Sequence, residues 1–450
     1  MARVFVLWDE SHLWGVLVLR ALRALKQPHV ILRAHDIAEG ALAGKPTAPC
    51  LFMGGGALAD PSGGPDLLIV PGGWARGRAE RLGPQGMQAI RDFVAAGGSY
   101  LGFCGGAGLA LSGARPGDSL GLCPWGRMGF AGRLQHFLSG HVRLGLDTGD
   151  PLCPPGVSGA GGGGEILAPV WWPAQFAPPP KGQKDDVRVL ARYAGLGADF
   201  WVADLNLALL PEETLSDWEN LYGVQIHPDF LTSRPAVIAG SFGAGRYVLS
   251  YPHLETPDSP QANAWFTHLL RELAGADPDA KPDANSNGSA IAPWNIGLDK
   301  CLWPDPGLLA AKAALERVIA LGESHLLLFW RNPWLLGWRR GLPGPGINSV
   351  YALVCEALAA APTASALAYW TEHGAEFARL SELFCSGLSG LLLAERLDMT
   401  VRATDSDQAF TYSLRETRRA LFGTAPALGG LCGELLRMLE ELCARLWGAE

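Results

Sequence analysis

The chain has 450 residues, of which 48% are hydrophobic and 18% are charged. This length and composition describe a folded globular protein with room for two domains, and they exclude a disordered chain. The formal net charge is -8 and no segment is rich in Lys and Arg, so binding to nucleic acid is not expected. No uninterrupted apolar stretch reaches the ~18 residues of a membrane span, so none is predicted.

The first residues and the cysteines bear on the location of the protein. The opening segment "MARVFVLWDESHLWG" lacks the charged start, long apolar run and small-residue cleavage site of a signal peptide. The nine cysteines show no paired spacing, which is typical of reduced thiols and not of a disulfide framework. We therefore expect a cytoplasmic protein in which any reactive cysteine must be recognised from its surroundings.

Short apolar runs alternate with amphipathic segments between Arg3 and Gly106. The predicted strands are "RVFVLW", "HVILRA", "DLLIVPGG" and "YLGFC", and the predicted helices are Val16–Leu25 and "GPQGMQAIRDFVAAGG". Strands separated by helices in this way favour a doubly wound, mostly parallel sheet with helices on both faces.

Composition divides the rest of the chain. Residues 113–184 are rich in Gly and Pro, which predicts irregular loops or hairpins inserted into a first domain over 1–274. Residues 275–297 are polar and rich in Pro, Asp, Asn and Ser, as in a linker. Apolar residues then recur at helical spacing, so residues 298–450 are expected to form an all-α domain of ~4 to 6 helices.

The segment "SYLGFCGGAGLALS" places Cys104 between a strand and a helix, with glycines on both sides. Glycines permit the strained backbone of a tight turn, and the start of a helix favours a thiolate and an oxyanion. Cys104 is therefore a candidate nucleophile. The alternative is a buried thiol beside glycines that serve only packing.

The segment "VLSYPHLETPDS" offers the partners of such a nucleophile. His253 and Glu255 are two residues apart in an extended segment, so their side chains project to the same side. The carboxylate can then orient the imidazole, which takes a proton from the thiol. The alternative is a surface histidine beside a solvated glutamate. In "LIVPGG", N–H groups at the edge of the sheet are expected to face the same crevice.

Together these motifs resemble the class I glutamine amidotransferase-like superfamily, which has a flavodoxin-like sheet. Within it the most similar domain is the one at the N-terminus of some eukaryotic biotin-protein ligases, on the evidence of "LIVPGGWA", "YLGFCGGAGLAL" and "GAGRYVLSYPHLE". The resemblance covers Met1 to Ala274. It implies Cys104 as nucleophile, His253 as base, Glu255 as orienting carboxylate, and Gly73 and Gly105 as oxyanion donors.

The chain departs from the superfamily in three respects. The amidotransferase signature around the histidine is His-Pro-Glu, whereas this chain has "HLE", and a second segment, "YGVQIHPDF", offers His227 and Asp229 as an alternative pair. We prefer His253 because it ends a predicted hairpin and retains the glutamate. The chain also lacks the adenylate-binding loop and catalytic lysine segment of a biotin ligase, and it has no nucleotide signature of an ammonia-accepting domain.

These features support two hypotheses of function. The first is a cysteine-dependent amidohydrolase or amidotransferase that forms a thioester with a small amide or acyl substrate. The second is a non-catalytic ligand-binding or scaffolding protein, with a protein partner on the helical domain.

Neither hypothesis includes a cofactor. Cys123, His136 and His141 lack the paired spacing of zinc ligands, so no metal is expected. The tryptophans near Trp334 are expected to be core residues, and contact with a membrane surface is not expected.

Overall fold

The chain divides into two compact units, Met1–Pro293 and Trp294–Glu450, and each is described here by itself. The computed structural model describes residues 3–43, 66–113, 117–128, 138–156, 164–179, 186–223, 227, 231–275, 289–339, 343–401, 408–424 and 428–447.

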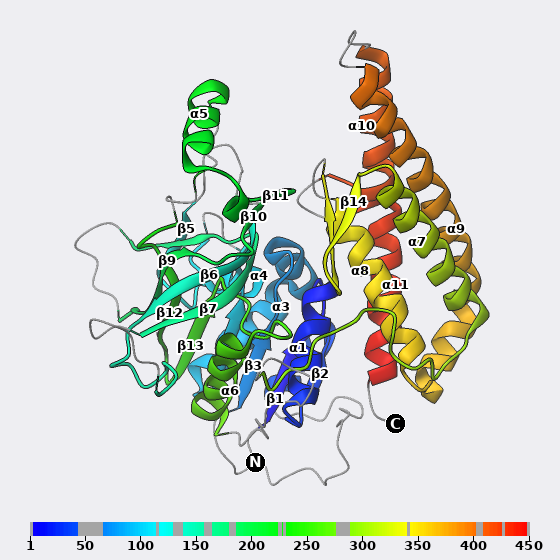
Figure 1. Ribbon diagram of the computed structural model, residues 1–450. Helices are drawn as coiled ribbons and strands as arrows, with labels where there is room; N and C mark the ends of the chain where they lie inside the picture. Colours follow the sequence, from blue (N-terminus) through cyan, green and yellow to red (C-terminus); the bar gives the residue numbers. More distant parts are fainter. Residues whose placement is uncertain are drawn as a thin grey trace. The chain divides into compact units, whose positions relative to one another are not determined.

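In the described residues, the first unit is built on a mixed sheet, which has 11 strands. Figure 1 shows this sheet with its flanking helices. Half of this sheet is parallel, in the spatial order β2–β1–β3–β4–β13. The bounds are β1 Val4–Leu7, β2 Val30–Leu32, β3 Leu67–Val70, β4 Ser99–Phe103 and β13 Gly245–Ser250. Nearly all residues of these strands are buried, because helices cover both faces.

The doubly wound arrangement that the sequence predicts is confirmed. One core joins the strands to α2, α3 and α4, and it contains Phe5, Leu68 and Ile90. Helices α1 and α6 cover the other face of the sheet (Figure 1). The bounds are α1 His12–Ala24, α2 Ala34–Ala38, α3 Ala75–Ala95, α4 Gly105–Ala110 and α6 Pro260–Ala274. The carboxyl ends of β1, β3, β4 and β13 therefore meet at one edge, where ligands bind in such sheets.

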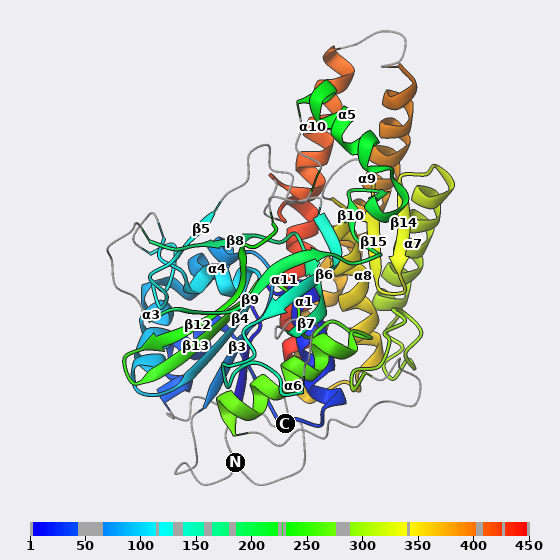
Figure 2. The ribbon, with the colours of Figure 1, turned by 60° about the vertical axis from the view of Figure 1, so that its left-hand side comes forward.

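The sheet continues from β13 as an antiparallel half, through β12, β9, β6, β10 and β11, with β7 also paired to β6 (Figure 2). Segment 113–184, predicted as irregular loops or hairpins, contains the antiparallel pair of long strands β6 and β7, in agreement with the hairpin alternative. The bounds are β6 Leu138–Leu146, β7 Gly164–Trp171, β9 Arg188–Leu196, β10 Trp201–Val202, β11 Leu205–Asn206 and β12 Pro235–Phe242.

Smaller elements complete the unit. A separate two-stranded sheet pairs β5 with β8, and helix α5 follows the antiparallel strands. The bounds are β5 Gly126–Met128, β8 Gln175–Ala177, α5 Glu212–Tyr222, and the short 3₁₀ helices η1 Ala41–Ala43 and η3 Leu207–Leu209.

The second unit is helical, as the sequence predicts, but it also contains a β-hairpin. The bounds are α7 Pro306–Ser324, β14 Leu328–Asn332, β15 Leu335–Trp338, α8 Pro343–Ala359, α9 Ala364–Val401, α10 Gln408–Phe422 and α11 Gly430–Trp447. The hairpin turns at Asn332, whose side-chain oxygen accepts hydrogen bonds from the N–H groups of Trp334 and Leu335 at 3.1 and 2.8 Å. The expectation of an all-α domain is corrected to this extent.

Helix α9 is distinguished by its length. Over Ala364–Thr400 it is long and apolar enough to cross a membrane, with a mean hydropathy of 1.3 in its most apolar window. In the described part of the chain it is the one helix with these properties, and 44% of that window is buried inside the protein. A single helix of this kind is weak evidence for a membrane span, because core helices of globular proteins have the same properties.

The expected linker over 275–297 lies largely outside the described residues. Its last part is described and is folded: Ser289 and Ile291 are buried, and the carbonyl of Ile291 accepts a hydrogen bond from the N–H of Asp258 at 3.1 Å. These residues therefore pack within the first unit.

His29 is a buried titratable group in the first unit. It lies directly before β2 and is 3% exposed, with Nδ1 2.9 Å from the carbonyl oxygen of Gln27. Burial lowers the pKa of His29 from 6.5 to about 4, because the charged ring loses its water. The folded protein therefore binds this proton less tightly than the unfolded chain does.

We predict that His29 makes the protein sensitive to acid. Its contribution to stability is complete above pH 6.5 and is lost as the pH falls toward 4, by up to roughly 3 kcal/mol. In urea titrations, the free energy of unfolding of His29→Asn should fall less steeply over this range than that of the wild type. The control His35→Asn removes an exposed histidine of α2 and should follow the wild type. Parallel pH dependences of the His29 variant and the wild type would contradict this assignment.

Candidate active site

Cys104 occupies a strained turn between β4 and α4. Its backbone has φ 46° and ψ -103°, a region that residues other than glycine rarely adopt. The N–H of Cys104 donates to the carbonyl of Ser250 at 2.7 Å, and the carbonyl of Cys104 accepts from the N–H of Gly108 at 2.9 Å. Such strain persists only where neighbouring contacts hold it, and it is concentrated at functional sites.

Glycines around Cys104 allow the backbone of this turn to touch the loop after β3. A Cβ atom added to Gly105 would lie 1.9 Å from the carbonyl oxygen of Gly73, and one added to Gly106 would lie 2.0 Å from that of Val70. Neither distance can accommodate a side chain. The two glycines that the resemblance implies as oxyanion donors, Gly73 and Gly105, are therefore in direct backbone contact.

His253 and Glu255 form a buried pair directly after β13. The Nδ1 atom of His253 is 2.7 Å from Oε1 of Glu255, and both side chains are fully buried. The N–H of His253 donates to the carbonyl of Pro169 in β7 at 2.8 Å. The imidazole centroid is 4.8 Å from the ring of Trp14 and 6.5 Å from that of Phe103. The carboxylate and the aromatic rings together fix the orientation of the imidazole.

The electrostatics of this pair favour a charged imidazole. Burial alone would lower the pKa of His253, but the Glu255 carboxylate and the Cys104 side chain outweigh it and raise the pKa to about 10. Among the described residues, Nε2 of His253 has no hydrogen-bond partner. The Cys104 sulfur is 3.9 Å from the carbonyl oxygen of Trp171, and the thiol is partly exposed. The arrangement leaves Nε2 able to exchange a proton with the thiol or with a bound molecule.

Arg78, at the start of α3, holds the loops that form one wall of the site. The residue is fully buried, and its guanidinium group donates five hydrogen bonds of 2.9 to 3.1 Å to the carbonyls of Asp9, Glu10, Pro71 and Gly72 and to Oγ of Ser11. Gly72 in turn lies against His253, because an added Cβ would be 2.6 Å from Cε1 of the imidazole.

Sequence reasoning missed Arg78. Its position in the segment "WARGRAERL" could have indicated it. Arg78 lies four residues before Leu82, on the same face of the helix, and next to Ala79, and both of these residues face the core. A charged residue on the buried face of a helix requires partners, and these are most often functional or structural polar groups.

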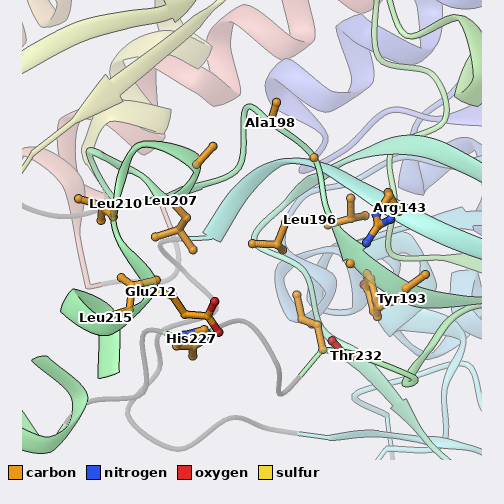
Figure 3. Close-up of a pocket in the computed structure, with 16 residues that line it drawn as sticks. Arg143, Tyr193, Leu196, Ala198, Leu207, Leu210, Glu212, Leu215, His227 and Thr232 are labelled. Atoms are coloured by element: carbon orange, nitrogen blue, oxygen red, sulfur yellow. The ribbon is translucent and has the colours of Figure 1, made fainter. Parts of the chain in front are cut away.

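The alternative base lies elsewhere in the first unit. His227 lines a cavity of about 660 Å³, and neither Cys104 nor His253 is among the residues that line it. Figure 3 shows the side chains of Glu212 and His227 next to each other at this cavity. Asp229 lies outside the described residues. Cys104 acts on the pKa of His253, whereas His227 lines this other cavity.

Cys123, His136 and His141 were not expected to hold a metal. Cys123 is buried and His136 lies outside the described residues. His141 contacts Asp199 and Ser259. Across the described ranges, no group of three or more His, Cys, Asp and Glu side chains is arranged to hold a metal ion.

Solved structures that resemble the chain include PurLQS from Thermotoga maritima, at 16% identity and a TM-score of 0.33, covering 60% of this chain and 99% of that chain. They also include a GMP synthase subunit from Thermoplasma acidophilum, at 13% identity and a TM-score of 0.35, covering 60% of this chain and 92% of that chain. A ThuA-like protein from Bacteroides uniformis has 12% identity and a TM-score of 0.35, covering 64% of this chain and 94% of that chain. Likeness at this level carries no argument about function.

No curated protein matches the sequence. Residues 62–113, which include β3, α3, β4 and the Cys104 turn, match the family model described as Biotin-protein ligase, N terminal. This match confirms the resemblance that the motifs indicate: in sequence the segment is similar to the N-terminal domain of biotin-protein ligases.

Proposed function

We propose that the first unit is a cysteine-dependent acyl-transfer enzyme, an amidohydrolase or amidotransferase that acts on a small amide or acyl substrate through Cys104. The observation that supports this proposal most directly is the fully buried His253–Glu255 pair, with its 2.7 Å contact, beside a cysteine held at φ 46°. A buried carboxylate that orients an imidazole beside a strained cysteine turn is the arrangement of covalent catalysis.

In the proposed reaction, Cys104 attacks the carbonyl carbon of the substrate as a thiolate while its proton resides on Nε2 of His253. The N–H groups of Gly73 and Gly105 are the candidate donors to the resulting oxyanion. The tetrahedral intermediate collapses to a thioester, and the leaving amine takes the proton from His253. Water or another acceptor then attacks the thioester, with His253 as the base, and Cys104 is regenerated.

Non-catalytic ligand binding is the second candidate function. It is favoured by the cavity of about 660 Å³ that contains His227, which lies apart from Cys104 and has an apolar wall from Leu196, Leu207 and Leu215 (Figure 3). Under this hypothesis the strained turn is a retained structural feature, and the helical unit is the surface for a protein partner.

We predict that Cys104 is acylated selectively. The protein should release p-nitrophenol from p-nitrophenyl acetate in a burst and carry one acetyl group on Cys104, as located by mass spectrometry. Cys301, an exposed thiol in the second unit, is the internal control and should react more slowly. His253→Gln should lower the acylation rate of Cys104 by about 10²-fold, the usual contribution of general acid–base catalysis. A Cys104 that reacts no faster than Cys301 favours the binding hypothesis.

We predict that the turn tolerates no side chain at Gly105. In Gly105→Ala the methyl group would collide with the carbonyl of Gly73, so acylation of Cys104 should be lost and the Tm lowered. Gly108→Ala is the matched control in the same helix, because its methyl group would lie 3.7 Å from Cβ of Ala75, an ordinary contact. This control should keep wild-type acylation. Equal behaviour of the two variants would show that the close approach at Gly105 is unimportant.

We predict that His253 makes stability depend on alkaline pH. Its pKa is about 10 in the folded protein and near 6.5 when unfolded, so its stabilising contribution is complete below pH 6.5 and is lost as the pH rises to 10. The difference in the free energy of unfolding between the wild type and His253→Gln should therefore shrink over this range. A constant difference in urea titrations at several pH values would contradict the charged pair.

A further inference from the structure

His141, Asp199 and Ser259 form a second chain of hydrogen bonds in the first unit. Nδ1 of His141 is 2.9 Å from Oδ2 of Asp199, and Nε2 is 3.1 Å from Oγ of Ser259. The N–H of His141 also donates to Oδ1 of Asp199 at 3.0 Å. These are the connections of a serine–histidine–aspartate relay, formed by β6, the turn between β9 and β10, and the residue before α6.

The burial of the three residues argues against a second nucleophile. The side chain of Asp199 is 51% exposed and that of His141 is 27% exposed, whereas Ser259 is 3% exposed. A nucleophilic serine must face its substrate, and its carboxylate partner is normally the protected member of the relay. In this chain the carboxylate is the most exposed member and the serine is the most buried one. The relay therefore holds the buried hydroxyl group of Ser259 in place through the more exposed side chains of His141 and Asp199.

Ser259 lies at the end of the segment that carries His253 and Glu255, the candidate catalytic pair. Ser259 follows His253 and Glu255 by a few residues, and its N–H donates to Oδ1 of Asn263 at 3.3 Å. Nδ2 of the fully buried Asn263 donates to the carbonyls of Leu254 and Thr256, both at 2.8 Å. These two carbonyls flank Glu255 on either side. Ser259 and Asn263 therefore connect His141 to the backbone that holds the carboxylate.

The segment contains backbone strain that requires such anchoring. Asp258 has φ 54°, in the left-handed region. The anchor itself is rigid, because an added Cβ on Gly140 would lie 2.3 Å from the carbonyl oxygen of Asp199, and the N–H of Gly197 donates to the carbonyl of His141 at 2.8 Å. Close backbone packing therefore fixes His141 and Asp199 relative to each other, independently of their side chains.

We propose that His141, oriented by Asp199, is a positioning residue for the His253–Glu255 pair and acts on it through Ser259 and Asn263. This inference rests on the proposed function, because the displaced group would be the base of the Cys104 reaction. His141 exchanges no proton with the reacting atoms. Its removal should let the segment between His253 and Ser259 relax, which lengthens the contact between Glu255 and His253.

The test compares His141→Ala and Ser259→Ala with a control variant in α6, the helix that follows Ser259. His268 lies in α6 and is half-buried, and its Nε2 atom is 2.8 Å from the carbonyl oxygen of Pro151, away from the segment. We expect acylation of Cys104 to fall about tenfold in the first two variants, less than the ~10²-fold loss that a full ångström of misplacement causes. His268→Ala should keep the wild-type rate.

A second measurement separates positioning from general loss of structure. The pKa of His253, followed by NMR of its ring protons, should fall toward 6.5 in His141→Ala and Ser259→Ala while the circular dichroism spectrum stays that of the wild type. An unchanged His253 titration in both variants would overturn the inference. This readout needs no activity: if Cys104 is not acylated even in the wild type, the proposed function fails, whereas the titration still decides whether His141 positions the pair.

Discussion

The Arg78 guanidinium group is the interaction on which the rest of the site depends. Its planar set of N–H donors matches the carbonyl groups of the two loops that follow β1 and β3, which would otherwise be buried without partners. Each unpartnered carbonyl would destabilise the folded protein by about 1–3 kcal/mol. Because the loop after β3 is fixed in this way, Gly72 packs against His253 and Gly73 against Gly105.

The site is assembled from parts with different requirements. The thiol needs a turn that exposes it, and the glycines of that turn supply the space. The imidazole and carboxylate need protection from water, and Trp14, Phe103 and strand β7 supply it. Strand β13 connects the two parts of the site. It pairs with β4, the strand that leads to Cys104, and it ends directly before the segment that carries His253. The sheet register, Ser250 opposite Phe103, thus helps to set the distance between Cys104 and His253.

Local patterns predicted much of this from the sequence. Alternating strands and helices gave the parallel half of the sheet, and the spacing of His253 and Glu255 indicated side chains on one side of an extended segment. The antiparallel pair β6–β7 agrees with the hairpin alternative for segment 113–184, but the pairing of β6 with β9 was not predicted, because composition does not reveal which strands pair. The contacts of Arg78 with Asp9, of Trp14 with His253 and of His141 with Ser259 were not predicted for a related reason: each joins residues far apart in the sequence, and no local pattern encodes such contacts.

The register of β13 with β4 also has a consequence for biosynthesis. The Cys104 turn and β4 are translated before β13, which lies more than a hundred residues further along the chain. Ser99, at the start of β4, likewise donates to the carbonyl of Leu273 at 2.8 Å, so β4 gains its full set of bonds only when α6 has formed. On the ribosome, Cys104 therefore emerges long before its histidine, and the growing chain carries an unaccompanied thiol until most of the first unit has been translated.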